Sequence, residues 1–290
     1  MKKLIIVILA LFVLSACATS AAPTRPPVVE SVPATATGTT LYISATMHIE
    51  TKSDSWPADK EAFLSFLQQT TDAGIHWSIG GDIGWLESAE DAQEIVQRSA
   101  AMGVQWDIHA HNPDDFGKIA YILNSWGVTP TNVVSGFLIQ NFDSLQASYS
   151  YQGMSWSPQV IWGGVVCAGH KPGCDDSSIS LYRPTSSSQF ELHNPNGNII
   201  KLGGGSHQLA DAELLAAQIA NGQYPYPVIG YTIMVEPETL RIATSSTDDL
   251  NAILAFVERM NQYPFVRWAT IQGTANAWVS AGEVPFQIGE

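Results

Sequence analysis

Residues 103–112 read GVQWDIHAHN, and this stretch indicates the fold of the whole chain. Gly103 ends a periodic helical pattern over Glu87–Met102, because glycine readily takes the left-handed conformation at a helix C-terminus. Val104–Ile108 follows as an apolar run of strand length. Asn112 then provides an N-cap for another helix, whose first turn is acidic. The stretch therefore predicts a helix, a buried strand and a second helix in direct succession.

The same alternation of strand and helix extends along the chain on both sides. Apolar runs predict strands at Leu41–Met47, His76–Ile79, Val104–Ile108, Val133–Ile139, Val160–Val166, Ile199–Leu202, Val228–Val235 and Val266–Ile271. Helical patterns lie at residues 57–74, 87–102, 112–127, 143–149, 209–220, 247–262 and 275–280, and residues 167–198 are predicted to be mostly loop. This alternation is typical of a (β/α) barrel of seven or eight largely parallel strands, with an open doubly wound sheet as the alternative.

The composition describes an acidic, folded protein. The chain has 13 Lys+Arg against 27 Asp+Glu, a formal net charge of -14. A phosphate backbone would repel such a chain, so no nucleic-acid partner is expected. The 9 Trp, 9 Tyr and 10 Phe residues supply a large aromatic core, which argues against general disorder.

The N-terminus has the pattern of an export signal. Lysines at positions 2 and 3 precede the unbroken apolar run LIIVILALFVL at residues 4–14. As a helix this run spans roughly 16 Å, too short for a hydrocarbon core of about 30 Å, so a cleaved signal peptide fits better than a membrane span. Residues 14–17, LSAC, resemble a bacterial lipobox, which implies cleavage before Cys17 and lipid attachment to its thiol. The alternative is an ordinary signal with a chance cysteine.

These segments divide the chain into three predicted parts. Residues 1–16 are the signal peptide, residues 17–40 are the lipidated cysteine with a flexible Pro/Ala/Thr linker, and residues 41–290 are the barrel domain. We therefore expect an exported lipoprotein of the bacterial cell envelope that contacts the membrane through its N-terminal lipid alone.

Two further cysteines, Cys167 and Cys174, flank the short segment AGHKPG. Export places them in an oxidising compartment, and the glycines and proline between them allow the chain to turn back on itself. A disulfide between them is therefore predicted. A metal site that includes His170 is the alternative.

Polar side chains follow several predicted strands at their carboxyl ends, where the active sites of (β/α) barrels lie. His48 and Glu50 end the first strand, Asp82 follows the second, and His109 and His111 end the third. Residues i and i+2 of an extended chain point to the same side, so each pair can converge on one ion. Zn²⁺ takes neutral histidine nitrogens and carboxylate oxygens. The sequence predicts a divalent metal, zinc first, held by the three histidines, with Glu50 and Asp82 as catalytic carboxylates.

Three segments together resemble the polysaccharide (carbohydrate) deacetylase superfamily. They are residues 46–50 (TMHIE), residues 103–111 (GVQWDIHAH) and residues 268–278 (WATIQGTANAW). The resemblance implies a distorted (β/α) barrel and a metal-dependent hydrolase that acts on an N-acetylated carbohydrate. The first motif of the family carries two adjacent aspartates, in place of which this chain has His48 and Glu50. The histidines of the second motif are usually four residues apart, whereas His109 and His111 are two apart.

In the implied reaction, Glu50 or Asp82 acts as general base on a metal-activated water, which attacks the acyl carbonyl. Trp56 and Trp85 are expected to stack on sugar rings. Arg183 lies in the segment Tyr-Arg-Pro, which resembles the arginine motif of the family, and is expected to contact the substrate.

Three other functions stay open at this point. A glycan-binding lipoprotein that kept the barrel and lost the chemistry is favoured by the altered first motif. A solute-binding or structural envelope protein would hold no metal. A metal-independent glycosidase needs two carboxylates about 5–9.5 Å apart, which Glu50, Asp82 and Glu236 could supply.

Overall fold

A computed structural model describes residues 38–51, 59–166, 174, 176, 178–203, 209–235 and 243–288, with the backbone alone over 243–249. All of these residues belong to one compact unit, Ala34–Glu290. No helix among them has both the length and the apolar character that crossing a membrane requires. Several predicted features lie outside the described residues: the signal peptide, Cys17, the linker up to residue 37, Trp56, Cys167, His170 and Glu236.

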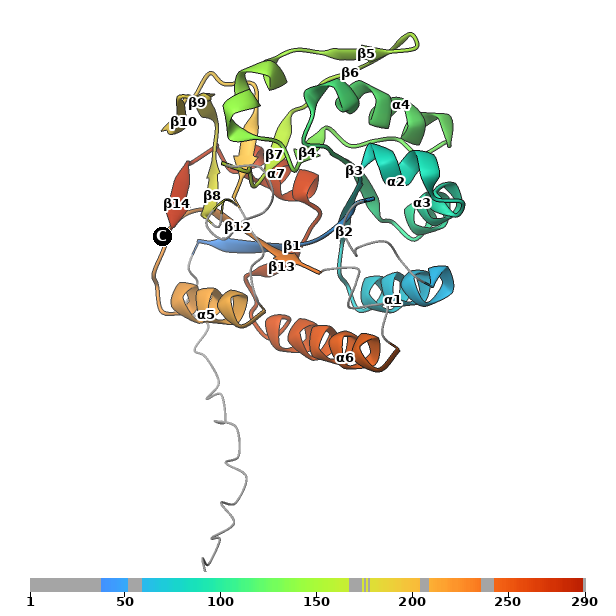
Figure 1. Ribbon diagram of the computed structural model, residues 1–290. Helices are drawn as coiled ribbons and strands as arrows, with labels where there is room; N and C mark the ends of the chain where they lie inside the picture. Colours follow the sequence, from blue (N-terminus) through green and yellow to red (C-terminus); the bar gives the residue numbers. More distant parts are fainter. Residues whose placement is uncertain are drawn as a thin grey trace, which may run out of the picture. The chain divides into compact units, whose positions relative to one another are not determined.

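A nearly closed sheet forms the centre of the molecule (Figure 1). In the described part of the chain it has ten strands: β1 (Thr40–Ile49), β2 (Trp77–Gly81), β3 (Gln105–His109), β4 (Val133–Ser135), β7 (Val160–Trp162), β8 (Ile179–Tyr182), β11 (Ile200–Leu202), β12 (Val228–Met234), β13 (Val266–Trp268) and β14 (Phe286–Ile288). The order is β12-β1-β2-β3-β4-β7-β11-β8-β14, with β13 paired to β1. Every pairing from β12 to β11 is parallel, and β8 and β14 pair antiparallel. The predicted (β/α) barrel is therefore confirmed.

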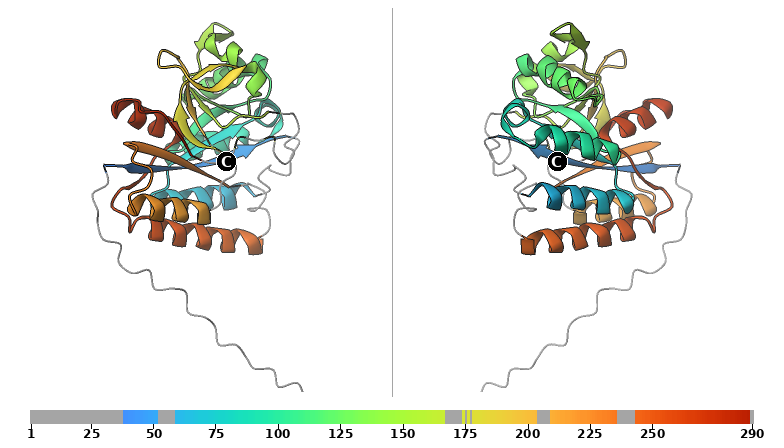
Figure 2. Two further views of the ribbon diagram at one scale, coloured as in Figure 1. Left: turned by 90° about the vertical axis from the view of Figure 1, so that its left-hand side faces the viewer. Right: turned by 90° about the vertical axis from the view of Figure 1, so that its right-hand side faces the viewer.

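Helices cover the outside of this sheet and close one end of it. They are α1 (Lys60–Asp72), α2 (Ile83–Ser88), α3 (Ala92–Ala101), α4 (Phe116–Ser125), α5 (Leu209–Ala220), α6 (Ala243–Met260) and α7 (Ile271–Ser280), with the 3₁₀ segments η1 (Pro113–Asp115) and η2 (Ile139–Gln146). Figure 2 shows α1, α5 and α6 together on one side of β1. The same views place α7 at the end of the barrel where β1 begins, opposite the end where the parallel strands finish.

The sequence of β1 explains its central position. From Ile43 to Ile49 every residue is buried, as expected for a parallel strand that is covered on both faces. Within this run Ser44, Thr46 and His48 alternate with apolar residues. Ser44 Oγ lies 3.0 Å from Thr274 Oγ1, and Thr46 Oγ1 donates to the Ser78 carbonyl over 2.8 Å. A row of polar side chains therefore runs along one face of β1 and leads to its carboxyl end.

The structure differs from the predicted elements in several places. The helix predicted over Glu87–Met102 is two helices, α2 and α3, because Asp82 caps a helix that starts earlier and the chain bends between Ala89 and Asp91. The segment 167–198, predicted as loop, contains β8 and the hairpin of β9 (Pro184–Ser186) with β10 (Gln189–His193). The helix predicted over residues 143–149 is mostly the 3₁₀ segment η2, and a second hairpin, β5 (Tyr149–Tyr151) with β6 (Met154–Trp156), follows it. These short strands alternate too briefly to give a period in the sequence.

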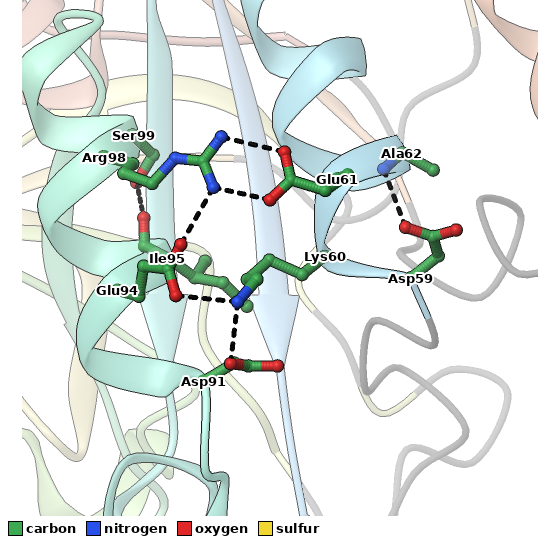
Figure 3. Close-up of polar contacts among 9 residues, drawn as sticks. All are labelled: Asp59, Lys60, Glu61, Ala62, Asp91, Glu94, Ile95, Arg98 and Ser99. Atoms are coloured by element: carbon green, nitrogen blue, oxygen red, sulfur yellow. Dashed lines mark hydrogen bonds and ion pairs between the residues drawn. The ribbon is translucent and has the colours of Figure 1, made fainter.

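An exposed network of ion pairs joins α1 to α3 (Figure 3). Lys60 Nζ lies 2.9 Å from Asp91 Oδ1 and 2.7 Å from Glu94 Oε2. Arg98 Nη1 lies 2.6 Å from Glu61 Oε1 and 2.9 Å from Glu94 Oε1. We call these five side chains the α1–α3 network. They lie in solvent, on the outer surface of the helical layer.

Candidate functional site

Three side chains predicted from the sequence converge at the carboxyl ends of β1 and β3. Glu50 directly follows β1, His109 is the last residue of β3, and His111 lies two residues later. One ligand atom from each of the three lies within 4.8 Å of the others, so the group could hold a metal ion. Since β2 separates β1 from β3 in the sheet, the side chains must reach across β2 to meet. We call these three residues the EHH cluster.

Two glycines make room for this reach. A Cβ atom on Gly80 of β2 would lie 2.6 Å from His109 Cβ, closer than real Cβ contacts come. A Cβ atom on Gly136 would lie 2.5 Å from His109 Cε1, and Gly136 has a φ of 74°, which side chains rarely adopt. His109 is fully buried between them. The backbone therefore fixes the ring of His109 in one place.

Hydrogen bonds orient both imidazole rings. His109 Nε2 lies 2.7 Å from Glu50 Oε1, and its Nδ1 lies 3.1 Å from Ser135 Oγ. His111 Nε2 lies 3.5 Å from the same Glu50 oxygen, and its Nδ1 contacts the Gly136 carbonyl oxygen. A carbonyl only accepts, so Nδ1 of His111 carries the proton. Nε2 donates to Glu50 when the ring is protonated and presents a lone pair when the ring is neutral.

The charges in the cluster are set by these contacts. Hydrogen bonds from His109 and then from His111 hold the pKa of Glu50 well below its usual range, although burial opposes them. Burial lowers the pKa of His109, against the pull of Glu50. The hydrogen bond to Glu50 raises the pKa of His111. Near neutral pH the cluster offers an ionised carboxylate and a neutral, buried imidazole, which are donors that divalent metals bind.

His48 lies beneath the cluster. Its ring stacks on the His109 ring with 3.9 Å between centroids and 27° between planes, and Trp162 meets it edge-on at 5.3 Å. The sequence analysis assigned His48 as a metal ligand and Glu50 as a base. In the structure Glu50 is part of the converging group, and His48 packs behind it.

Asp82 lies between the two strand ends, as predicted, and has a defined local task. Its Oδ1 accepts hydrogen bonds from the Trp85 N–H over 2.6 Å and the Thr51 hydroxyl over 2.8 Å, and its Oδ2 accepts from the Thr51 N–H over 3.0 Å. Asp82 thus caps α2 and holds the residue after Glu50. Its side chain is partly exposed.

Two other predicted site residues are not brought to the cluster. Trp85 has no exposed surface and stacks on Trp106, with 5.9 Å between ring centroids, so it belongs to the core. Arg183 follows β8, which runs antiparallel to β11, so it lies towards the opposite end of the barrel from the EHH cluster. There its guanidinium pairs with Glu283 at 2.9 Å and stacks over Trp278.

Cys174 is disulfide-bonded and buried. Because Cys167 lies outside the described residues, the pairing of these two cysteines stays a prediction.

The sequence analysis missed the groups that orient the histidines. Ser135 ends β4 and Gly136 follows it, which is the same position in their strand that His109 and Ala110 occupy in β3. The signal was the Ser-Gly pair within VVSGFLI, but the apolar residues after it extended the predicted strand to Ile139. The strand end was therefore placed four residues too late.

The fold can be compared with those of known proteins. No protein-family model matches the sequence, and no curated protein is significantly similar to it. One solved structure with the same fold comes from Parabacteroides distasonis and is provisionally assigned as a glycoside hydrolase/deacetylase. The TM-score is 0.55 at 11% sequence identity, and the match covers 83% of this chain and 71% of that chain. The two proteins therefore share the (β/α) barrel fold.

Proposed function

We propose that this protein is a metal-dependent hydrolase that removes an acyl group from an N-acetylated carbohydrate. The observation that carries the proposal is the convergence of Glu50, His109 and His111 at the carboxyl end of the barrel. The polysaccharide deacetylase resemblance of the sequence and the shared fold of the P. distasonis protein support the substrate class.

The donor set fits a divalent transition metal. Two imidazole nitrogens and one carboxylate oxygen form the three-ligand set of catalytic zinc sites, which leave a further position open. We propose zinc on this ground. When bound, such an ion supplies Lewis-acid chemistry and makes water a nucleophile near neutral pH.

The neighbouring groups have separate roles in this proposal. Ser135 fixes the rotation of the His109 ring, and the Gly136 carbonyl fixes the rotation and tautomer of His111, the task that second-shell partners perform in metal sites. Glu50 serves as a ligand in place of the base predicted from the sequence. Asp82 is then the candidate general base, because its carboxylate is partly exposed and held in position by Thr51 and Trp85.

We also propose that the chain is exported and held at the cell envelope by lipid on Cys17. The apolar run of residues 4–14 and the segment LSAC support this location. A carbohydrate of the envelope or its surroundings would then be within reach of the barrel.

The proposed reaction is tested by acetate release from a soluble oligosaccharide of N-acetylglucosamine. We expect the purified full chain to release acetate, to stop after treatment with a chelator, and to resume when zinc is added. A chain that binds the oligosaccharide and releases no acetate with any divalent metal would instead be a glycan-binding protein.

A further inference from the structure

A concave site lies at the opposite end of the barrel from the EHH cluster. It is a groove of about 920 Å³, within the usual range for small-molecule sites of about 300–1,000 Å³. Gln105 is the first residue of β3, and Asn132 and Gln159 directly precede β4 and β7. These strands are neighbours and parallel, so the groove follows their amino-terminal ends. The EHH cluster lies at their carboxyl ends.

The lining of the groove is rich in amide side chains and free of charge. Of the described residues that line it, none is Asp, Glu, Lys, Arg or His. The side-chain amides come from β3, from the segments before β4 and β7, and from α3 and α7: Gln97, Gln105, Asn132, Gln159, Gln272 and Asn276. The partly exposed indole of Trp126 lies beside them.

Part of this hydrogen-bonding capacity is unused. Gln105 Oε1 and Gln272 Oε1 are buried and have no hydrogen-bond partner among the described residues. Both oxygens lie beneath the surface of the groove, so the groups that can meet a ligand directly are the exposed ones. Gln159 and Asn276 are exposed at the rim and can both donate and accept.

This combination selects the chemistry of the ligand. An uncharged lining gives no electrostatic preference for an anion or a cation. Amide groups match the hydroxyls of a sugar, which also donate and accept, and an indole face packs on apolar C–H surface. We infer that the groove is a second carbohydrate-binding site for a neutral oligosaccharide. It would bind the part of the substrate chain that is distant from the reacting end. The groove shares no residue with the EHH cluster, and its part in holding the substrate rests on the proposed function.

Calorimetric titration tests the inference with two soluble probes, the hexasaccharides of β-1,4-linked N-acetylglucosamine and of β-1,4-linked glucose. The full chain carrying Glu50→Gln serves as the background, since it keeps the groove intact. We expect binding in this background. Adding Gln159→Ala with Asn276→Ala, two exposed positions that the fold tolerates, should weaken it about tenfold or more, the loss of one or two hydrogen bonds.

Gln93→Ala is the matched control, an exposed amide on α3 outside the groove, and should bind as the background does. Trp126→Ala provides a second variant, with weaker binding expected and the fold checked by circular dichroism. Failure of both probes to bind, or equal binding by the groove variants and the background, would overturn the inference. A failed proposed function gives another pattern, because binding in the groove would persist while the unaltered protein released no acetate.

Discussion

Two clusters of acid–base contacts in this barrel differ in setting and therefore in what they do. The α1–α3 network pairs Lys60 and Arg98 with three carboxylates in solvent (Figure 3). The EHH cluster places one carboxylate between two histidines, of which His109 is fully buried. The first uses side chains that stay charged over the physiological range. The second uses groups whose protonation depends on their surroundings.

The two clusters differ in the hydration free energy that their charged groups lose on folding. Exposed ion pairs lose little hydration and gain little, so the α1–α3 network ties two helices together without a large effect on stability. Burying a carboxylate beside imidazoles has a large desolvation penalty, which hydrogen bonds and charge must offset. A fold keeps such an arrangement where it serves a function, and sites of this kind often reduce stability.

Replacing both histidines of the EHH cluster should abolish hydrolysis. In His109→Ala, His111→Ala, two of three proposed metal ligands are gone, so acetate release should fall to the background level. His76→Ala, which removes an exposed histidine outside the cluster, is the control and should keep full activity. Activity that survives in the double variant would show that the cluster is not the catalytic site.

Glu50→Gln should remove the negative charge of the cluster while keeping the shape of the side chain. Without the carboxylate, the hydrogen bond that raises the pKa of His111 loses its charged partner. The pKa of His111 should fall, and zinc affinity should drop by about a hundredfold or more, since a neutral amide is a poor ligand. NMR titration of the His111 ring measures the first effect, and competition with a chelating dye measures the second. An unchanged pKa of His111 would contradict the described contact.

Ser135→Ala tests whether the Ser135 hydroxyl orients the His109 ring for metal binding. The substitution removes the hydroxyl at Nδ1 of His109 and leaves every proposed ligand in place. Loss of a second-shell partner typically weakens metal binding by about 10–100-fold. Ser144→Ala, an exposed serine outside the cluster, is the control. Equal zinc affinities of the Ser135→Ala variant and the unaltered protein would remove Ser135 from the site.

Asp107 shows the effect of burial on a carboxyl group that, unlike Glu50, is hydrogen-bonded to a threonine in place of histidines. It lies in β3 beneath His109, accepts a hydrogen bond from the Thr131 hydroxyl over 2.6 Å, and burial raises its pKa to about 8. The unfolded chain has a pKa near 3.9 at this residue, so the folded state binds the proton more tightly. Its contribution to stability is complete below about pH 4 and is lost as the pH rises towards 8.

Asp107→Asn, which mimics the protonated acid, should therefore flatten the dependence of the free energy of unfolding on pH between 5 and 8. Urea unfolding at several pH values measures the slope for both proteins. Parallel slopes would show that Asp107 is ionised in the folded protein across this range.

The α1–α3 network should tolerate loss of its cations. Lys60→Met with Arg98→Met removes every ion pair of the network, yet the melting temperature should change by a few degrees at most because the pairs are exposed. Acetate release should not change. A large fall in melting temperature, measured by calorimetry, would mean that the two clusters differ less in energy than their burial suggests.

Much of the fold could be predicted from the sequence, because strong local signals coincide with the elements. Helix α5 has the predicted bounds, and β1 and β3 match to within two residues at each end. The strands β8 and β14 were not predicted. β8 pairs antiparallel with both β11 and β14, and these pairings join segments far apart in the chain, which local patterns do not reveal.

The members of the candidate site were predictable, but their arrangement was not. Strand ends identified Glu50, His109 and His111. Which of Glu50 and His48 reaches the group depends on register across three strands, where His48 pairs with Gly80 and Gly80 with Asp107. Because β1 ends at Ile49, Glu50 lies beyond the sheet and can turn towards the histidines, while His48 stays in the strand beneath them.

Metal content is the most direct test of whether Glu50, His109 and His111 bind a metal ion. The full chain and the His109→Ala, His111→Ala variant would be incubated with zinc, freed of unbound metal and measured by elemental mass spectrometry. The account predicts about one zinc ion per chain in the unaltered protein and close to none in the variant. Equal zinc content in the two proteins, or none in either, would contradict a metal site at Glu50, His109 and His111.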